Sequence, residues 1–154
     1  MSVVLVQALG DDAGTWEEAG RLWYASAREA HTWLPMLQTL SEADAVRIFS
    51  AMTEGATLYG VRDGGTLAGL LALEGEWVER LYVSTASQGR GIGDALLAHA
   101  RALRPDGLRL YTHQLNARAR AFYERRGFRP VRFGLSPPPE SVPDVEYHWP
   151  GTDC

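Results

Sequence analysis

The chain has 154 residues, about the length of one domain, and 45% of them are apolar and 22% are charged. These values exclude a disordered chain and a fibrous repeat. The longest apolar run, residues 67–73, is too short to cross a bilayer. We expect no secretory signal, because the first residues lack a basic segment followed by a long apolar one. The only cysteine, Cys154, excludes a zinc site built from several cysteines. We therefore expect one cytoplasmic domain, residues 1–154, with no membrane association and no metal.

Charge is divided unevenly along the chain. The net charge is −4, and all 15 basic residues are arginines. Residues 80–132 hold 11 arginines and three acidic residues, whereas residues 1–79 hold four arginines and 12 acidic residues. This division favours an anion bound by the middle of the chain and a cation that approaches the acidic first part. Nucleic acid is not expected, because the overall balance is acidic and no basic-aromatic binding motif is present.

Apolar periodicity and turn residues predict four helices and seven strands. Pro35 should end or kink the first helix, Gly64-Gly65 should close a hairpin, and Gly127 should form a left-handed helix C-cap. The element order predicts an α+β domain with a mixed sheet. In chain order the elements are strand 3–7, helices 12–34 and 41–52, strands 56–61, 66–73 and 77–83, helix 91–103, strand 108–112, helix 116–126, and strands 128–133 and 142–149.

A glycine-rich loop joins the strand at 77–83 to the helix that follows it. Gly89, Gly91 and Gly93 alternate with other residues directly before that helix. Glycines let the backbone come close to a ligand, and the N–H groups at a helix N-terminus favour an anion such as a phosphate or pyrophosphate. A P-loop is excluded because the chain has no lysine. The dinucleotide fingerprint fails because its third glycine would fall on Asp94 or Leu96.

Two segments carry a family resemblance. The loop Gln88-Gly89-Arg90-Gly91-Ile92-Gly93 resembles the acetyl-CoA signature of the GCN5-related N-acetyltransferase (GNAT) superfamily, which begins with Gln or Arg and has glycine at the fourth position and glycine or alanine at the sixth. Residues 116–128 are similar to the N-x-x-A-x-x-F-Y-x-x-x-G-F block of the same family. The resemblance implies a mostly antiparallel sheet of six to seven strands with about four helices. The sheet would be splayed between its fourth and fifth strands to admit acetyl-CoA as cosubstrate.

The resemblance also implies roles for particular residues. Residues 88–93 would bind the pyrophosphate, and the backbone of Leu81, Tyr82 and Val83 would pair with the pantetheine arm. Asn116 would help to hold this arm, although it is also a good helix N-cap. Tyr123 would lie beside the coenzyme sulfur as a general acid; the alternative is a tyrosine that only packs in the core.

The general base is less clearly encoded. A free alkylamine has a pKa of about 10 and must lose a proton before it attacks a thioester. By the period-two rule the odd-numbered residues of strand 77–83 share one face. Some family members carry a catalytic glutamate where this chain has Trp77, and others where it has Tyr111. Glu79 is the first candidate base and His113 the second, with ordered water as an alternative.

The resemblance implies direct transfer of the acetyl group to a primary amine, without a covalent acyl-enzyme. The acceptor pocket would be built from residues 31–35 and 147–149. The excess of acidic residues in 1–79 favours a cationic small-molecule amine as partner. Two alternatives stay open: an acetyltransferase for protein lysines or N-termini, and a non-catalytic acyl-CoA-binding module. The sequence also leaves open the acyl chain and the choice between monomer and homodimer.

Overall fold

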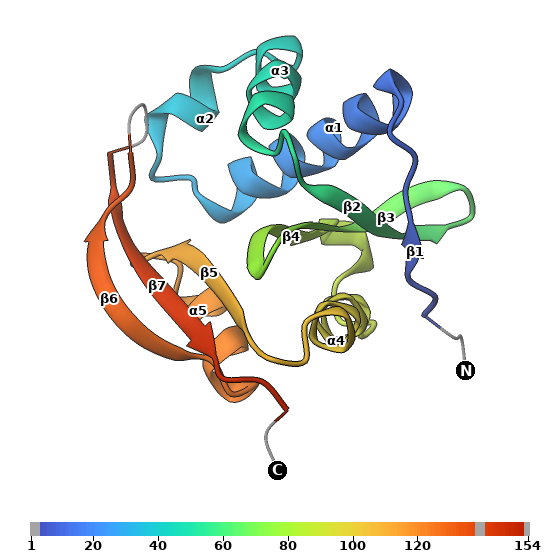
Figure 1. Ribbon diagram of the computed structural model, residues 1–154. Helices are drawn as coiled ribbons and strands as arrows, with labels where there is room; N and C mark the ends of the chain where they lie inside the picture. The colour runs from blue at the N-terminus through green and yellow to red at the C-terminus, as the bar shows by residue number, and fades with distance from the viewer. Residues whose placement is uncertain (1–3, 138–140, 153–154) are drawn as a thin grey trace.

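The computed structural model describes residues 4–137 and 141–152. Within these ranges the chain forms one seven-stranded sheet with the strand order β1-β2-β3-β4-β5-β7-β6 (Figure 1). The strands are β1 Gln7–Ala8, β2 Thr57–Asp63, β3 Thr66–Glu74, β4 Trp77–Val83, β5 Leu108–His113, β6 Arg129–Leu135 and β7 Pro143–Trp149. The helices are α1 Ala13–Ala30, α2 Pro35–Thr39, α3 Glu42–Met52, α4 Ile92–Leu103 and α5 Ala117–Arg125, with a 3-10 turn η1 at Thr85–Ser87.

The α+β class and the predicted order of elements are confirmed, and the differences are local. The first helix ends at Ala30, and Pro35 begins the separate helix α2 instead of kinking α1. Proline suits the first turn of a helix, because its missing N–H would have no partner there. The described residues thus contain five α-helices instead of about four. The first strand is Gln7–Ala8, and Val3 of its predicted span lies outside the described residues.

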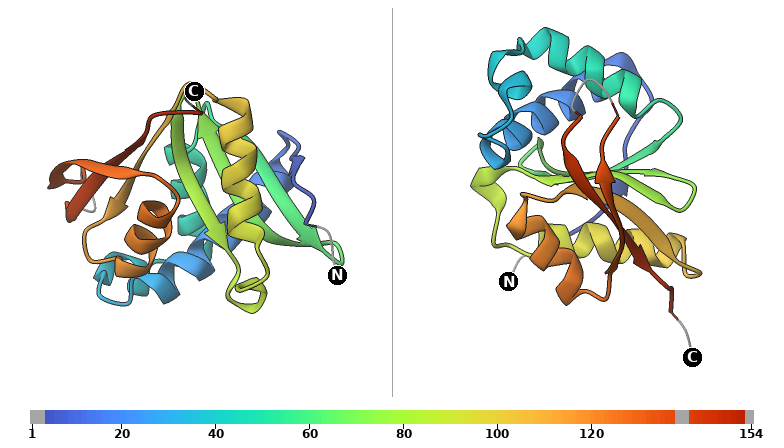
Figure 2. Two further views of the ribbon diagram at one scale, coloured as in Figure 1. Left: turned by 90° about the horizontal axis from the view of Figure 1, so that it is seen from below. Right: turned by 90° about the vertical axis from the view of Figure 1, so that its left-hand side faces the viewer.

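The sheet lies between two layers of helices. Helices α4 and α5 cover one face, and α1, α2 and α3 cover the other (Figure 2). The interior strand β3 is buried on both faces: Leu71 packs toward α4, and Leu70 packs toward α1 and α3. This explains why the longest apolar run of the sequence is a strand. Among the described residues, no helix is long and apolar enough to cross a membrane.

The sheet opens between β4 and β5. These strands form the only parallel pair in the described sheet, and they are paired only at Trp77 with Arg109 and at Val78 with Leu110. Beyond these two pairs the strands diverge toward their C-terminal ends, as the left view of Figure 2 shows. The predicted splay between the fourth and fifth strands is therefore confirmed.

A β-bulge lies at the point where β4 leaves β5. Val78 pairs with Leu73 while Arg80 pairs with Ala72, so Glu79 is the extra residue. The bulge breaks the alternation of side chains along β4. The prediction that the odd-numbered residues of this strand share one face is wrong: Leu81 and Val83 pack with Val78 in the core beneath α4, whereas Trp77 stacks on an exposed tyrosine of β5.

Candidate active site

The loop before α4 has the geometry of an anion site. Gly89 and Gly91 have φ angles of 80° and 79°, in the left-handed region that strains other residues. Gly91 is the N-cap of α4, and no other atoms lie within 4 Å of where a Cβ would stand on either glycine. The first N–H groups of a helix have no partner within the helix, so they are available to a bound anion.

The other residues of the loop fix its position. The Gln88 amide donates to the Val83 carbonyl at 3.4 Å, and Arg90 forms a 2.7 Å ion pair with Asp63 of the β2–β3 hairpin. Ile92 is buried in the core, which leaves only its backbone for a ligand. Gly93 serves a different purpose, because a Cβ there would lie 3.3 Å from the Phe122 ring of α5.

The open edge of β4 borders a cavity. From Glu79 to Val83 this strand pairs with β3 on one side and with no described strand on the other. The cavity has a volume of about 750 Å³. Its walls come from α1 to α3, from β4 and β5, from the end of β6 with the residues that follow it, from the start of β7, and from α5. The lining residues used below are His31, Glu79, Arg80, Tyr111, His113, Asn116, Tyr123, Arg132, Gly134 and Asp144.

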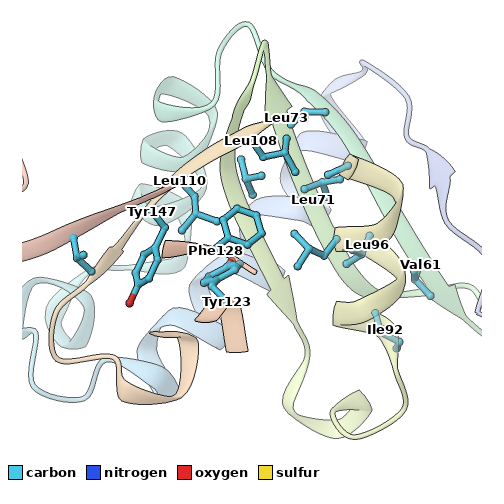
Figure 3. Packing of buried hydrophobic residues seen from close by; sticks show 14 of the residues in the cluster. Val61, Leu71, Leu73, Ile92, Leu96, Leu108, Leu110, Tyr123, Phe128 and Tyr147 are labelled. Carbon is cyan, nitrogen blue, oxygen red and sulfur yellow. The ribbon is translucent and has the colours of Figure 1, made fainter. Parts of the chain in front are cut away.

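Tyr123 of α5 lines the cavity and also belongs to the hydrophobic core beneath the sheet. Its ring, 7% exposed, packs edge-on against Phe128 at 5.5 Å and lies 6.4 Å from the Tyr147 ring (Figure 3). Burial raises the pKa of the Tyr123 hydroxyl well above its usual value of 10. The hydroxyl therefore keeps its proton near neutral pH and can donate it.

Asn116 reaches the same cavity from the beginning of α5. Its side-chain oxygen accepts a 3.1 Å hydrogen bond from the Ala119 N–H, which caps the helix. The residue also lines the cavity wall. The structure thus shows its N-cap role, and a contact with a bound coenzyme stays compatible with it.

The bulge places Glu79 on the cavity wall. The side chain is half-buried, and its pKa is raised by burial, which outweighs the lowering effect of Arg80; Glu74 raises it further. A carboxylate with a raised pKa is a better proton acceptor at neutral pH than an ordinary one.

The second candidate base, His113, belongs to an aromatic cluster at the far end of β5. Its ring lies 4.6 Å from His31 and 5.3 Å from Trp33, both after the end of α1. His31 is only 2% exposed, and burial together with the nearby His113 lowers its pKa to about 4. His31 is therefore neutral at pH 7. This cluster could not be identified from the sequence, because 82 positions separate its two histidines.

The predicted acceptor pocket is only partly correct. His31 lines the cavity, but Tyr147 and Trp149 do not. Tyr147 is fully buried on the α5 side, where its hydroxyl donates to Glu124 at 2.5 Å, and Trp149 packs near Phe128 on the same side. Alternation along β7 places the even-numbered residues on the opposite face. The cavity therefore includes Asp144, which sequence reasoning missed although the polar residues at 144, 146 and 148 alternate with apolar ones.

Comparison with known proteins identifies the class of this chain. Residues 47–130 match the family model for the acetyltransferase (GNAT) domain, which covers more than half of the chain. The chain therefore belongs to the GNAT family, and it is an acetyl-CoA-dependent acetyltransferase.

A relative and two solved structures agree with this assignment. The peptidyl-lysine N-acetyltransferase YjaB of Salmonella typhimurium is 29% identical over 108 residues, which cover 70% of this chain and 72% of that protein. The solution structure of apo YjaB from Escherichia coli superimposes with a TM-score of 0.79 at 19% identity, over 97% of this chain and 99% of that one. The structure of the PaiA N-acetyltransferase of Thermoplasma acidophilum in complex with coenzyme A superimposes with a TM-score of 0.68 at 17% identity, over 97% of this chain and 99% of that one. At these identities the two structures establish the fold.

Proposed function

We propose that this enzyme transfers acetyl from acetyl-CoA directly to a primary amine of a small molecule, with residues 1–154 as one catalytic domain. One observation carries the proposal. The opening between β4 and β5 leads to a single cavity whose wall contains both a buried tyrosine, Tyr123, and a half-buried glutamate, Glu79. Transfer to an amine needs a proton donor for the leaving thiolate and a proton acceptor for the ammonium.

The coenzyme would be bound mainly by backbone groups. The N–H groups of residues 89–93 suit the pyrophosphate, because the loop is open and lies at the positive end of the α4 dipole. The β5-facing backbone edge at Leu81, Tyr82 and Val83 lies beyond the last β4–β5 residue pair, and it suits the amides of an extended pantetheine arm. Asn116 would contact the same arm from the other side of the opening.

The two side chains would move the protons. Glu79 takes a proton from the acceptor ammonium, directly or through a water molecule. The amine nitrogen then forms a bond to the acetyl carbon as the carbon–sulfur bond breaks. Tyr123 donates its hydroxyl proton to the departing sulfur, the attacking nitrogen loses its second proton to solvent as the amide forms, and solvent reprotonates Tyr123 and takes the proton from Glu79. Burial makes Glu79 more basic, which supports its role, and Tyr123 is in the protonated form from which it can donate.

Protein lysine is the second candidate acceptor. The relative from Salmonella typhimurium is named a peptidyl-lysine N-acetyltransferase, which favours this alternative. The small molecule is supported by the cavity itself, since α1 to α3 and the β6–β7 end form walls around it and histidine, tyrosine and tryptophan side chains are among its lining.

Coenzyme A release from acetyl-CoA in the presence of small primary amines and of lysine-containing peptides tests the proposal. We expect turnover with small amines. Tyr123→Phe should lower kcat about 100-fold or more while the Kd for acetyl-CoA stays within about twofold, because the ring is kept and only the acid is lost. Glu79→Gln should lower kcat and remove the rise of the rate with pH that the base causes.

Tyr59→Phe is the matched control for Tyr123, since it removes a hydroxyl from β2 outside the cavity and should leave kcat unchanged. Full activity of Tyr123→Phe would contradict the acid role. Turnover of peptides alone would replace the small-molecule acceptor by protein lysine.

A further inference from the structure

Two carboxylates lie two positions apart on the same face of β7, and they differ in their partners. Glu146, 5% exposed, contacts His148 at 2.5 Å and the Tyr111 hydroxyl at 3.3 Å, with two arginine side chains within 4.0 Å. Asp144 is 9% exposed. Within residues 4–137 and 141–152 its carboxylate has no ion pair and accepts no hydrogen bond from another residue.

The environment of Asp144 does not compensate for its burial. Burial raises its pKa most, whereas the nearby His113 on β5 and the backbone N–H of Asp144 itself lower it. A largely buried carboxylate attracts an opposite charge more strongly than an exposed one, so it suits a cationic ligand. Asp144 lines the cavity of the candidate active site. On β6 its register partner is Gly134, where a Cβ would stand 3.7 Å from Asp144 Oδ1 and fill the space beside it.

The two arginines of the cavity wall are engaged elsewhere, while His113 is the register partner of Asp144 on β5. Arg80 donates to the Glu79 carbonyl at 2.6 Å and to the Met52 sulfur at 3.2 Å. The Arg132 side chain is 75% exposed, and its ion-pair partner is Glu146 at 3.9 Å. His31 is neutral because its pKa is lowered to about 4. A cationic group in the cavity would therefore find the Asp144 carboxylate available.

We propose that Asp144 binds a second cationic group of the acceptor, so that the enzyme prefers diamines to monoamines. One amine reaches Glu79 and is acetylated, while the other stays protonated and pairs with Asp144. This inference rests on the proposed acetylation of small primary amines and specifies their class. It makes Asp144 a specificity-determining residue that takes no part in the bond changes.

The test compares acceptors that differ only in the second amine: 1,4-diaminobutane with butylamine, and 1,5-diaminopentane with pentylamine. Coenzyme A release gives kcat/KM for each, corrected for the two equivalent amines of a diamine. In the wild type we expect the diamine to be favoured about 10-fold or more, as for a partly desolvated charge-assisted pair. In Asp144→Asn the ratio should fall close to one through loss on the diamine alone.

Two further measurements make the result decisive. Asp106→Asn removes the same charge from an exposed turn outside the cavity and should keep the preference. The acetyl-CoA affinity of Asp144→Asn should equal that of the wild type, which shows that the variant is folded.

Three outcomes would overturn the inference. Equal use of diamines and monoamines by the wild type would reject it and leave the proposed function intact, as would an unchanged ratio in Asp144→Asn. An equal fall of the ratio in Asp106→Asn would assign the preference to net charge instead of to this site. Failure of every amine to release coenzyme A would reject the proposed function and this inference with it.

Discussion

Burial sets the protonation states of the ionisable residues around the cavity. It keeps Tyr123 protonated, raises the pKa of Glu79 and keeps His31 neutral. The family resemblance pointed to Tyr123 and Asn116, because both belong to one block of recognisable spacing, and both line the cavity; their roles toward the coenzyme stay predictions. It could not predict Asp144, since its neighbours on β5 and β6 are set by strand pairing between distant segments.

His31 gives a prediction for stability against pH. Its pKa is about 4 in the folded protein and about 6.5 when unfolded, so only the unfolded chain takes up this proton between these values. The free energy of unfolding should therefore fall as the pH drops from about 6.5 to about 4, by up to about 3 kcal/mol from this residue. Urea unfolding of the wild type and of His31→Phe at pH 7.5 and pH 4.5 isolates the effect. The wild type should lose more stability than His31→Phe between pH 7.5 and pH 4.5. Equal losses in the two proteins would contradict the account.

At the scale of elements, the sequence predicted order and type well but missed local irregularities. Turn residues and the N-cap residue Asn116 marked helices, and the cap at Asn116 is present. The bulge at Glu79 could not be predicted, because it arises from the register of β3 against β4 and leaves no clear pattern in either strand. Helix α2 was missed since five residues are too few to show a helical period.

The packing of α4 on β3 gives an element-scale prediction. A Cβ on Gly69 of β3 would stand 2.5 Å from Ile92 Cγ2 and 3.0 Å from Leu96 Cδ1. Gly69→Ala should therefore lower the free energy of unfolding by about 1–3 kcal/mol. Acetyl-CoA binding should also weaken, because Ile92 begins the helix whose N-terminus would hold the pyrophosphate.

A double-mutant cycle checks the cause. Ile92→Ala removes the obstructing methyl group, so Gly69→Ala combined with Ile92→Ala should cost less than the sum of the single changes, by about 1 kcal/mol. Additive losses in urea unfolding would show that the close approach of α4 and β3 is not responsible.

At the scale of the whole molecule, one sheet lies between two layers of helices, and strand pairing is limited in the middle of this sheet, between β4 and β5. Two residue pairs connect β4 to β5, whereas six or more connect β2 to β3, β3 to β4 and β5 to β7. The opening thus combines the β4 edge beyond the last β4–β5 residue pair with the loop that leads to α4. The resemblance predicted this splay, but the volume and walls of the cavity depend on how α1 to α3 and the β6–β7 end pack around it.

The central claim is that the N-terminus of α4 binds the pyrophosphate of acetyl-CoA, and calorimetric titration with acetyl-CoA tests it most directly. Gly91 and Gly65 offer a matched pair, because both have a positive φ, 79° and 88°, and open space around them, but Gly65 lies in the β2–β3 turn. We predict micromolar binding to the wild type and to Gly65→Asp. In Gly91→Asp the new carboxylate at the anion site should weaken the affinity for acetyl-CoA about 10-fold or more. No binding to the wild type, or equal affinity in the two variants, would contradict the account.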